Sequence, residues 1–256
     1  MAGIFMKRGM TIAIPPGGLS LMLGDDGTVA GNLTIHLRFD VCPTWTDLAL
    51  RHLADAKAKM TQRVDAWAGP DEDQKATALE REFEASMQAI VAAAIAVDAF
   101  YALIQTHVHL PTNITKQWRT KRTPRYSQVT EVLRRAFGLK RKGVAALRQN
   151  LREIYRFRDL AVHPSAKLQA PEMHPELGVG VEWRFAHFRA HNAELIVNAA
   201  TWILWDLAHQ GKPESPAIRQ YIDELRQKLS ILFPSGHPSS AQRQTETAHD
   251  GIAGAA

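Results

Sequence analysis

Arg158, Asp159 and His163 are the residues of this sequence best suited to acid–base chemistry beside an anion. An imidazole titrates near neutral pH and can take up or release a proton. An arginine side chain stays charged and can hold a phosphate through two parallel hydrogen bonds. Asp159 precedes His163 by four residues, which places both on the same side of a helix. We therefore expect Asp159 to orient the imidazole of His163.

The residues around this group predict the end of a helix. Apolar residues recur with helical spacing over Leu151–Val162, and Pro164 cannot continue the hydrogen-bonding pattern. Pro164 also biases His163 away from helical backbone angles. Arg158 lies five residues before His163, about 140° around an ideal helix, whereas Arg156 would face His163 better in a regular helix. Because Pro164 disturbs the helix end, Arg158 is the first candidate and Arg156 the second.

A carboxylate is expected in the core of the protein. The segment Ala89–Ala102 is apolar on nearly every side and predicts the most buried helix, yet it contains Asp98. A carboxylate in such surroundings needs a partner, and we expect Asp98 to anchor Arg158 or Arg156. Asp98 also makes this apolar run too short and too polar to predict a membrane-spanning helix.

Positive charge is concentrated in one part of the chain. Residues 110–164 contain 14 Lys/Arg and three Asp/Glu, a net charge of +11, whereas the whole chain carries +5. This asymmetry suggests a polyanion-binding face rather than general solubility. The alternative is an ordinary solvated surface, which a basic run alone favours. Aromatic residues in the same region could stack on bases or pack on their own domain. The residues that we expect to contact the polyanion are Lys116, Trp118, Arg119, Lys121, Arg122, Arg125, Lys140, Arg141, Lys142 and Arg152.

The periodicity predicts a mainly α protein with a small β appendage. Within residues 1–42, alternation over Leu33–Val41 indicates a strand with one buried face, and Asp25–Gly27 is a turn signal. We expect a β-hairpin or meander that packs on the helices. Residues 43–233 predict a helical bundle, and residues 234–256 are expected to form a disordered tail.

The helical period also predicts individual elements. Two stretches that contain several prolines or glycines, about 109–125 and about 165–184, are expected to be loops. The expected helices cover about 44–67, 71–107, 126–137, 140–162, 186–210 and 215–232.

The run from Arg158 to His163, Arg-Asp-Leu-Ala-Val-His, resembles the Arg-polar-x-x-x-His signature of the HEPN superfamily. The apolar helix around Asp98 is similar to the family helix that carries one acidic residue near this signature. The resemblance covers about residues 80–210. It departs from the toxin members that are paired with a nucleotidyltransferase antitoxin, because these often have tyrosine where this chain has Ser165.

The resemblance implies an all-α bundle that dimerises so that two signatures face each other, and that cleaves RNA without a metal. In this interpretation Arg158, His163 and Asp159 are catalytic, and Asp98 and Arg156 support them. It also implies a role in stress or phage defence and a protein inhibitor or antitoxin as a partner.

The chemistry of such a cleavage follows from RNA itself, which carries the nucleophile as its 2′-hydroxyl. His163 would act as base or acid and Arg158 would hold the phosphate, with a 2′,3′-cyclic phosphate as the product. No cofactor is required. The alternative function is a catalytically inactive helical module that binds RNA or a protein partner through the same basic surface.

The single cysteine, Cys42, excludes an internal disulfide and a cysteine-based metal cluster, and it suits a reducing cytoplasm. A metal site could instead use His187 with His191, or His107 with His109. No glutamate lies between His187 and His191, so the zinc-protease pattern is absent. We therefore expect a cytoplasmic protein with no metal and no membrane segment.

Overall fold

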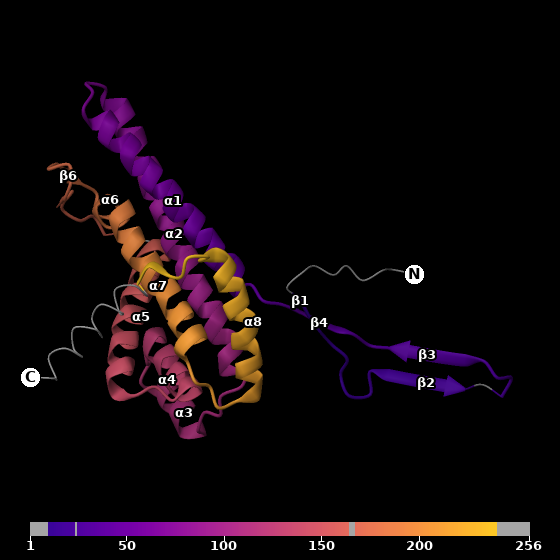
Figure 1. The fold of residues 1–256 in the computed structure, drawn as a ribbon. Helices are drawn as coiled ribbons and strands as arrows, with labels where there is room; N and C mark the ends of the chain where they lie inside the picture. The colour runs from indigo at the N-terminus through magenta and orange to yellow at the C-terminus, as the bar shows by residue number, and fades with distance from the viewer. Residues whose placement is uncertain (1–9, 24, 164–166, 240–256) are drawn as a thin grey trace, which may run out of the picture. The chain divides into compact units, whose positions relative to one another are not determined.

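The computed structural model describes residues 10–23, 25–163 and 167–239. The chain divides into two compact units, residues 1–41 and 42–256, the first built from strands and the second mainly from helices (Figure 1). The predicted mainly α class with an N-terminal β appendage is confirmed.

The N-terminal unit consists of two nested antiparallel ribbons, in which β1 pairs with β4 and β2 pairs with β3. The inner turn forms where the sequence predicts it. Gly27 has a φ of 78°, and the Asp26 carboxylate accepts hydrogen bonds from the amide and hydroxyl of Thr28 at 3.0 and 2.6 Å. The strands are β1 (Met10–Ala13), β2 (Leu19–Leu23), β3 (Val29–Leu33) and β4 (His36–Phe39).

The prediction that a strand of this unit has a buried face is wrong within the unit itself. None of the residues in these four strands is buried, and Leu33, Leu37 and Phe39 are 52%, 40% and 42% exposed. The physical reason is that a two-stranded ribbon has no second layer of its own to cover a face. The packing of the appendage on the helices stays a prediction.

In the described part of the second unit, eight helices and a two-stranded ribbon follow one another along the chain. The central α2 packs against α1, α4, α5 and α7, and α1 and α2 lie side by side (Figure 1). The elements are α1 (Cys42–Trp67), α2 (Glu72–Gln105), α3 (Thr112–Thr120), α4 (Arg125–Phe137), α5 (Arg141–Val162), β5 (Glu172–Met173), β6 (Gly180–Val181), α6 (Trp183–His187), α7 (Ala190–Gln210) and α8 (Pro216–Leu232).

The sequence explains both the start of α2 and its central place. Asp71 caps the helix by accepting hydrogen bonds from the amides of Asp73 and Gln74 at 3.0 and 3.1 Å. Buried alanines between Ala85 and Ala96 let neighbouring helices approach closely. By length and composition α2 could cross a membrane, and 56% of its apolar window is buried inside the bundle, as in the core helix of a soluble protein.

Three helix predictions differ from the structure. The predicted loop at 109–125 contains α3, because Trp118 packs on the core and gives this short helix a partner. The predicted helix 186–210 is divided into α6 and α7, since Phe188 leaves the helical conformation with a ψ of 64°. In α1, helical spacing from Leu53, Ala56 and Met60 predicts Val64 in the core. Val64 is instead 55% exposed, and Arg63 occupies the buried face.

Arg63 belongs to a buried cluster of charges that the periodicity did not predict. Its guanidinium donates to the carboxylates of Glu82 and Glu176. Glu176 also accepts from Arg189 at 2.6 Å, and Glu82 accepts from the amide of Ala190 at 2.9 Å. The cluster therefore joins α1, α2, the segment between β5 and β6, and the start of α7.

Replacing Arg63 with Leu should lower the free energy of unfolding by roughly 3–5 kcal/mol, because Glu82 would stay buried without its cation. Urea denaturation followed by circular dichroism measures the loss. Lys57→Met is the control, since it removes the cation of the exposed Lys57–Glu194 pair (2.6 Å) and should cost less than about 1 kcal/mol. Equal losses in the two variants would contradict the importance of the buried cluster.

The predicted disorder of the tail is wrong for residues 234–239, whereas residues 240–256 lie outside the described residues. His237 is 1% exposed, and its Nε2 lies 2.9 Å from the hydroxyl of Thr201 in α7. Its ring also contacts those of Phe233 and Trp202, with centroid distances of 4.9 and 5.3 Å. The aromatic surface of α7 and the end of α8 thus holds this segment in place.

His237 should make folding stability depend on pH. Burial lowers the pKa of His237 to about 4, so between about pH 6.5 and 4 the unfolded chain binds more protons than the folded chain. Stability therefore falls as pH falls through this window, by about 2 kcal/mol from pH 7 to pH 5. His237→Phe should lose that part of the pH dependence in urea titrations, whereas the exposed His191→Phe should retain it.

Candidate functional site

Asp98 of α2 is the centre of the predicted site. Its Oδ1 accepts hydrogen bonds from Nε and Nη2 of Arg125 at 3.1 and 3.0 Å and from the hydroxyl of Tyr155 at 2.7 Å. Its Oδ2 accepts from Nη1 of Arg158 at 2.9 Å. The predicted contact between Asp98 and Arg158 is therefore present. Arg156, the second candidate, instead donates at 2.9 Å to Glu153, which lies three residues earlier on the same helix, α5.

The aromatic side chains of α2 and α5 reinforce this arrangement. Burial, then the charge of Asp98 and its hydrogen bond, raise the pKa of Tyr155, so its phenol stays protonated and donates. The guanidinium of Arg158 lies over the Tyr155 ring, 4.9 Å from its centroid, and that of Arg125 lies 4.2 Å from the Tyr101 centroid. Both arginines are thus held by a carboxylate and by a ring.

Asp159 has a partner different from the one expected. Its Oδ1 accepts from Nε and Nη2 of Arg158 at 3.1 and 2.8 Å, and among the described residues no hydrogen bond joins it to the imidazole of His163. The carboxylate that was expected to orient His163 therefore occupies the outer edge of Arg158. The Asp159 side chain is 52% exposed, so an incoming anion could replace it there.

His163 ends the helix as predicted. Helix α5 stops at Val162, and His163 has extended backbone angles (φ −111°, ψ 95°) while its amide still donates to the carbonyl of Asp159 at 3.0 Å. The His163 side chain is exposed. Pro164 lies outside the described residues. The motif therefore presents a titratable imidazole to solvent five residues after a braced arginine.

The cations of the predicted RNA-binding surface lie on α3, on the turn that follows it and on α5. Arg125 is an exception, because it is bound to Asp98, and Trp118 packs on the core rather than standing free as a stacking platform. Among the described residues, no acidic partner neutralises the remaining cations, which are Lys116, Arg119, Lys121, Arg122, Lys140, Arg141, Lys142 and Arg152.

Helix electrostatics do not explain the cations at the start of α5. Lys140 is the N-cap residue, Arg141 and Lys142 follow it, and the first turn contains no acidic residue. A helix N-terminus is positive, so cations there are unfavourable by roughly 0.3–1 kcal/mol each. Their presence favours an interaction with an anion over a contribution to helix stability.

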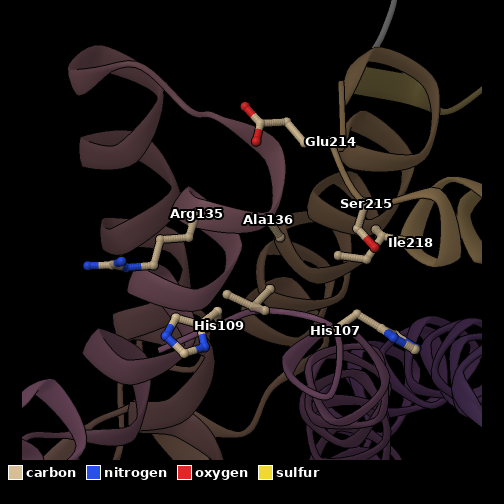
Figure 2. A pocket seen from close by; sticks show the side chains of 8 residues that line it. His107, His109, Arg135, Ala136, Glu214, Ser215 and Ile218 are labelled. Atoms are coloured by element: carbon tan, nitrogen blue, oxygen red, sulfur yellow. The ribbon is translucent and has the colours of Figure 1, made fainter. Parts of the chain in front are cut away.

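A small cavity lies away from the motif, between the end of α2, α4 and the start of α8 (Figure 2). Its volume is about 210 Å³, and none of its lining residues belongs to the motif. The imidazoles of His107 and His109 point away from each other (Figure 2), which does not fit the alternative in which they share a metal. The lining residues are His107, Val108, His109, Arg135, Ala136, Glu214, Ser215 and Ile218.

The second histidine pair is also poorly placed for a shared metal. His187 ends α6 and His191 lies in α7, so the two do not share one regular helix. The Nδ1 atom of His187 lies 3.0 Å from the carbonyl of Trp183. Within the described residues there is no group of three or more His, Cys, Asp or Glu side chains that could hold a metal ion.

No family model matches this chain, and neither a curated protein nor a solved structure matches it. The HEPN resemblance therefore depends on the run from Arg158 to His163 and on the helix around Asp98. The contact between Arg158 and Asp98 joins these two features in space.

Replacing Asp98 with Ala should destabilise the bundle by roughly 3 kcal/mol, because two arginines and a tyrosine lose their shared acceptor. Tyr155→Phe removes one neutral donor from the same carboxylate and should cost only about 1 kcal/mol. Urea denaturation compares the two variants. A loss in Asp98→Ala no larger than in Tyr155→Phe would show that Asp98 does not hold the helices together.

Proposed function

We propose that this protein is a HEPN-like RNA-binding protein that cleaves RNA without a metal, through the RNA 2′-hydroxyl. The observation that supports the proposal is the pairing of Arg158 with Asp98 at 2.9 Å, five residues before the exposed His163. Asp98 limits the movement of a cation that can hold a phosphate, and the helix end exposes an imidazole five residues later in the chain.

In the proposed reaction, a phosphate of RNA replaces Asp159 at the outer edge of Arg158. His163 takes the proton of the 2′-hydroxyl or delivers a proton to the departing 5′-oxygen, and solvent water makes the other proton transfer. The 2′-oxygen forms a bond to phosphorus as the bond to the 5′-oxygen breaks, which leaves a 2′,3′-cyclic phosphate. Arg158 stabilises the negative charge that develops on the phosphate, and Asp98 keeps the guanidinium in position.

RNA is favoured as the ligand by the cations of the predicted RNA-binding surface other than Arg125, which have no acidic partner among the described residues. The exposed side chains of Lys116, Arg119 and Arg152 can contact phosphates along a strand. The further parts of the proposal come from the resemblance: a homodimer, a cytoplasmic location, a protein inhibitor or antitoxin as partner, and a role in stress or phage defence.

The test is incubation of a labelled RNA with the full chain in EDTA. The expected result is cleavage that falls at least about 100-fold in His163→Ala and in Arg158→Ala, the magnitude of a lost acid–base or charge-stabilising group. Arg156→Ala is the matched control, because Arg156 lies on the same helix but bonds to Glu153, and it should change the rate by less than about 3-fold.

A modified RNA substrate tests whether the 2′-hydroxyl is the nucleophile. An RNA with one 2′-deoxy nucleotide at the cleaved position should resist the protein, and mass spectrometry of the products should show a 2′,3′-cyclic phosphate. Binding of RNA without cleavage across several pH values would instead support the inactive interaction module. Equal cleavage by wild type and His163→Ala would overturn the assigned role of His163.

Charge reversal at the start of α5 separates binding from stability. Arg141→Glu/Lys142→Glu should weaken RNA binding at least about 10-fold at low salt while it raises the free energy of unfolding by about 1 kcal/mol. Lys212→Glu/Arg219→Glu changes the net charge equally near the start of α8 and should leave RNA affinity within about 3-fold of wild type. Filter binding and urea denaturation measure the two quantities, and equal losses of affinity would refute a defined surface.

A further inference from the structure

The inner ribbon of the N-terminal unit has one entirely apolar face. The register pairs Leu19 with Leu33, Leu21 with Gly31 and Leu23 with Val29. Directly opposed residues of an antiparallel pair share a face, and so do residues two apart along a strand. The four leucines, the valine and the glycine therefore lie together on one side of the ribbon. The residues between them, such as Met22, lie on the other side.

This apolar face is exposed. Leu21, Leu23 and Val29 are 68%, 76% and 66% exposed, and Leu19 and Leu33 are 57% and 52% exposed. Two-stranded ribbons are marginally stable in water unless another layer covers one face. A ribbon that exposes five aliphatic side chains on one face is therefore expected to be stabilised by another surface that covers this face.

Charge does not protect this ribbon from association. Between Met10 and Ile35 the only Asp, Glu, Lys or Arg residues are Asp25 and Asp26, both in the turn. Natural sheets limit edge-to-edge association with lysine, proline or inward-pointing charges on their edge strands. A second copy of the same face would meet no charge repulsion over the length of either strand.

The face is also flat at its centre. Gly31 has no side chain, and Leu21 Cδ2 lies 3.2 Å from the place that a β-carbon on Gly31 would take. Leu21 therefore leans across the ladder instead of projecting away from it. Flat aliphatic faces of this kind pack against each other at about 10 Å in β-sandwiches.

We propose that this face, Leu19, Leu21, Leu23, Val29, Gly31 and Leu33, is a homodimer interface that packs on the same face of a second copy of the chain. A two-fold axis parallel to the strands would place β2 of one copy over β3 of the other, with the leucine row above the row that contains Gly31. The self-complementary register fits such an isologous contact. Covering the five aliphatic side chains of both copies buries on the order of 1,000 Å², the size at which specific interfaces begin.

Analytical ultracentrifugation of the full chain tests this proposal, which is independent of the proposed RNA cleavage. The wild type should sediment as a dimer of 28.5 kDa chains. Leu21→Glu should raise the dimer dissociation constant at least about 100-fold, because it places a charge in a dry interface. Met22→Glu is the matched control: Met22 is 69% exposed on the opposite face, and the change should be less than about 3-fold.

A second pair of variants separates the interface from folding of the ribbon. Leu33→Glu and Asn32→Glu place the same charge on the two faces of β3, and only Leu33→Glu should dissociate the dimer. Thermal unfolding of the helical unit should be the same in all four variants. A short bismaleimide should cross-link Leu23→Cys, on the apolar face, much faster than Met22→Cys, with the buried Cys42 present in both.

Several results would overturn the proposal. One is a wild-type chain that stays monomeric at its solubility limit. Another is a dimer that resists Leu21→Glu, which would assign association to a different surface. Equal weakening by Leu21→Glu and Met22→Glu would show that the apolar face is not selective. A monomer that floats with phosphatidylcholine vesicles, and loses this property in Leu21→Glu, would assign the face to lipid.

Discussion

The helical unit depends on the hydrogen bonds that the carboxylate of Asp98 accepts. Asp98 lies on α2 and accepts hydrogen bonds from side chains of α4 and α5, so one partly buried acid connects three helices. A carboxylate in apolar surroundings is unfavourable without such partners. Arg125, Tyr155 and Arg158 supply them, and each is oriented in return. The same hydrogen bonds that satisfy Asp98 in the core therefore also fix the position of Arg158.

The two carboxylates that bind Arg158 show how this arrangement affects the chemistry of the surface. Asp98 holds its inner edge, and Asp159, which is half exposed, holds its outer edge. The inner contact is less exposed, with Asp98 at 24% against 52% for Asp159, and is the stronger restraint, whereas the outer contact is more screened and replaceable. Arg158 thus combines a fixed position with an edge open to an anion. Arg156 has no such restraint, because its partner Glu153 is itself exposed to solvent on the same helix.

The two units differ in how much of their apolar surface they bury. The helical unit buries its apolar residues around α2 and even encloses ion pairs, such as that of Arg63 with Glu82. The strand unit leaves its aliphatic side chains exposed along both ribbons. The helical unit contains the residues of the proposed chemistry, and the strand unit contains a surface suited to association. The boundary between the two units lies after Val41.

The amino-acid sequence by itself determined the class of the fold, most helix boundaries, the end of α5 at His163 and the need of Asp98 for a cation. These follow from local rules: periodicity, capping, proline geometry and the cost of burying a charge. Only the tertiary structure decided that Arg158 is the partner of Asp98 and that Asp159 bonds to Arg158. It also revealed the buried Arg63 cluster. Side-chain pairings between distant elements depend on helix rotation and packing, which local patterns do not specify.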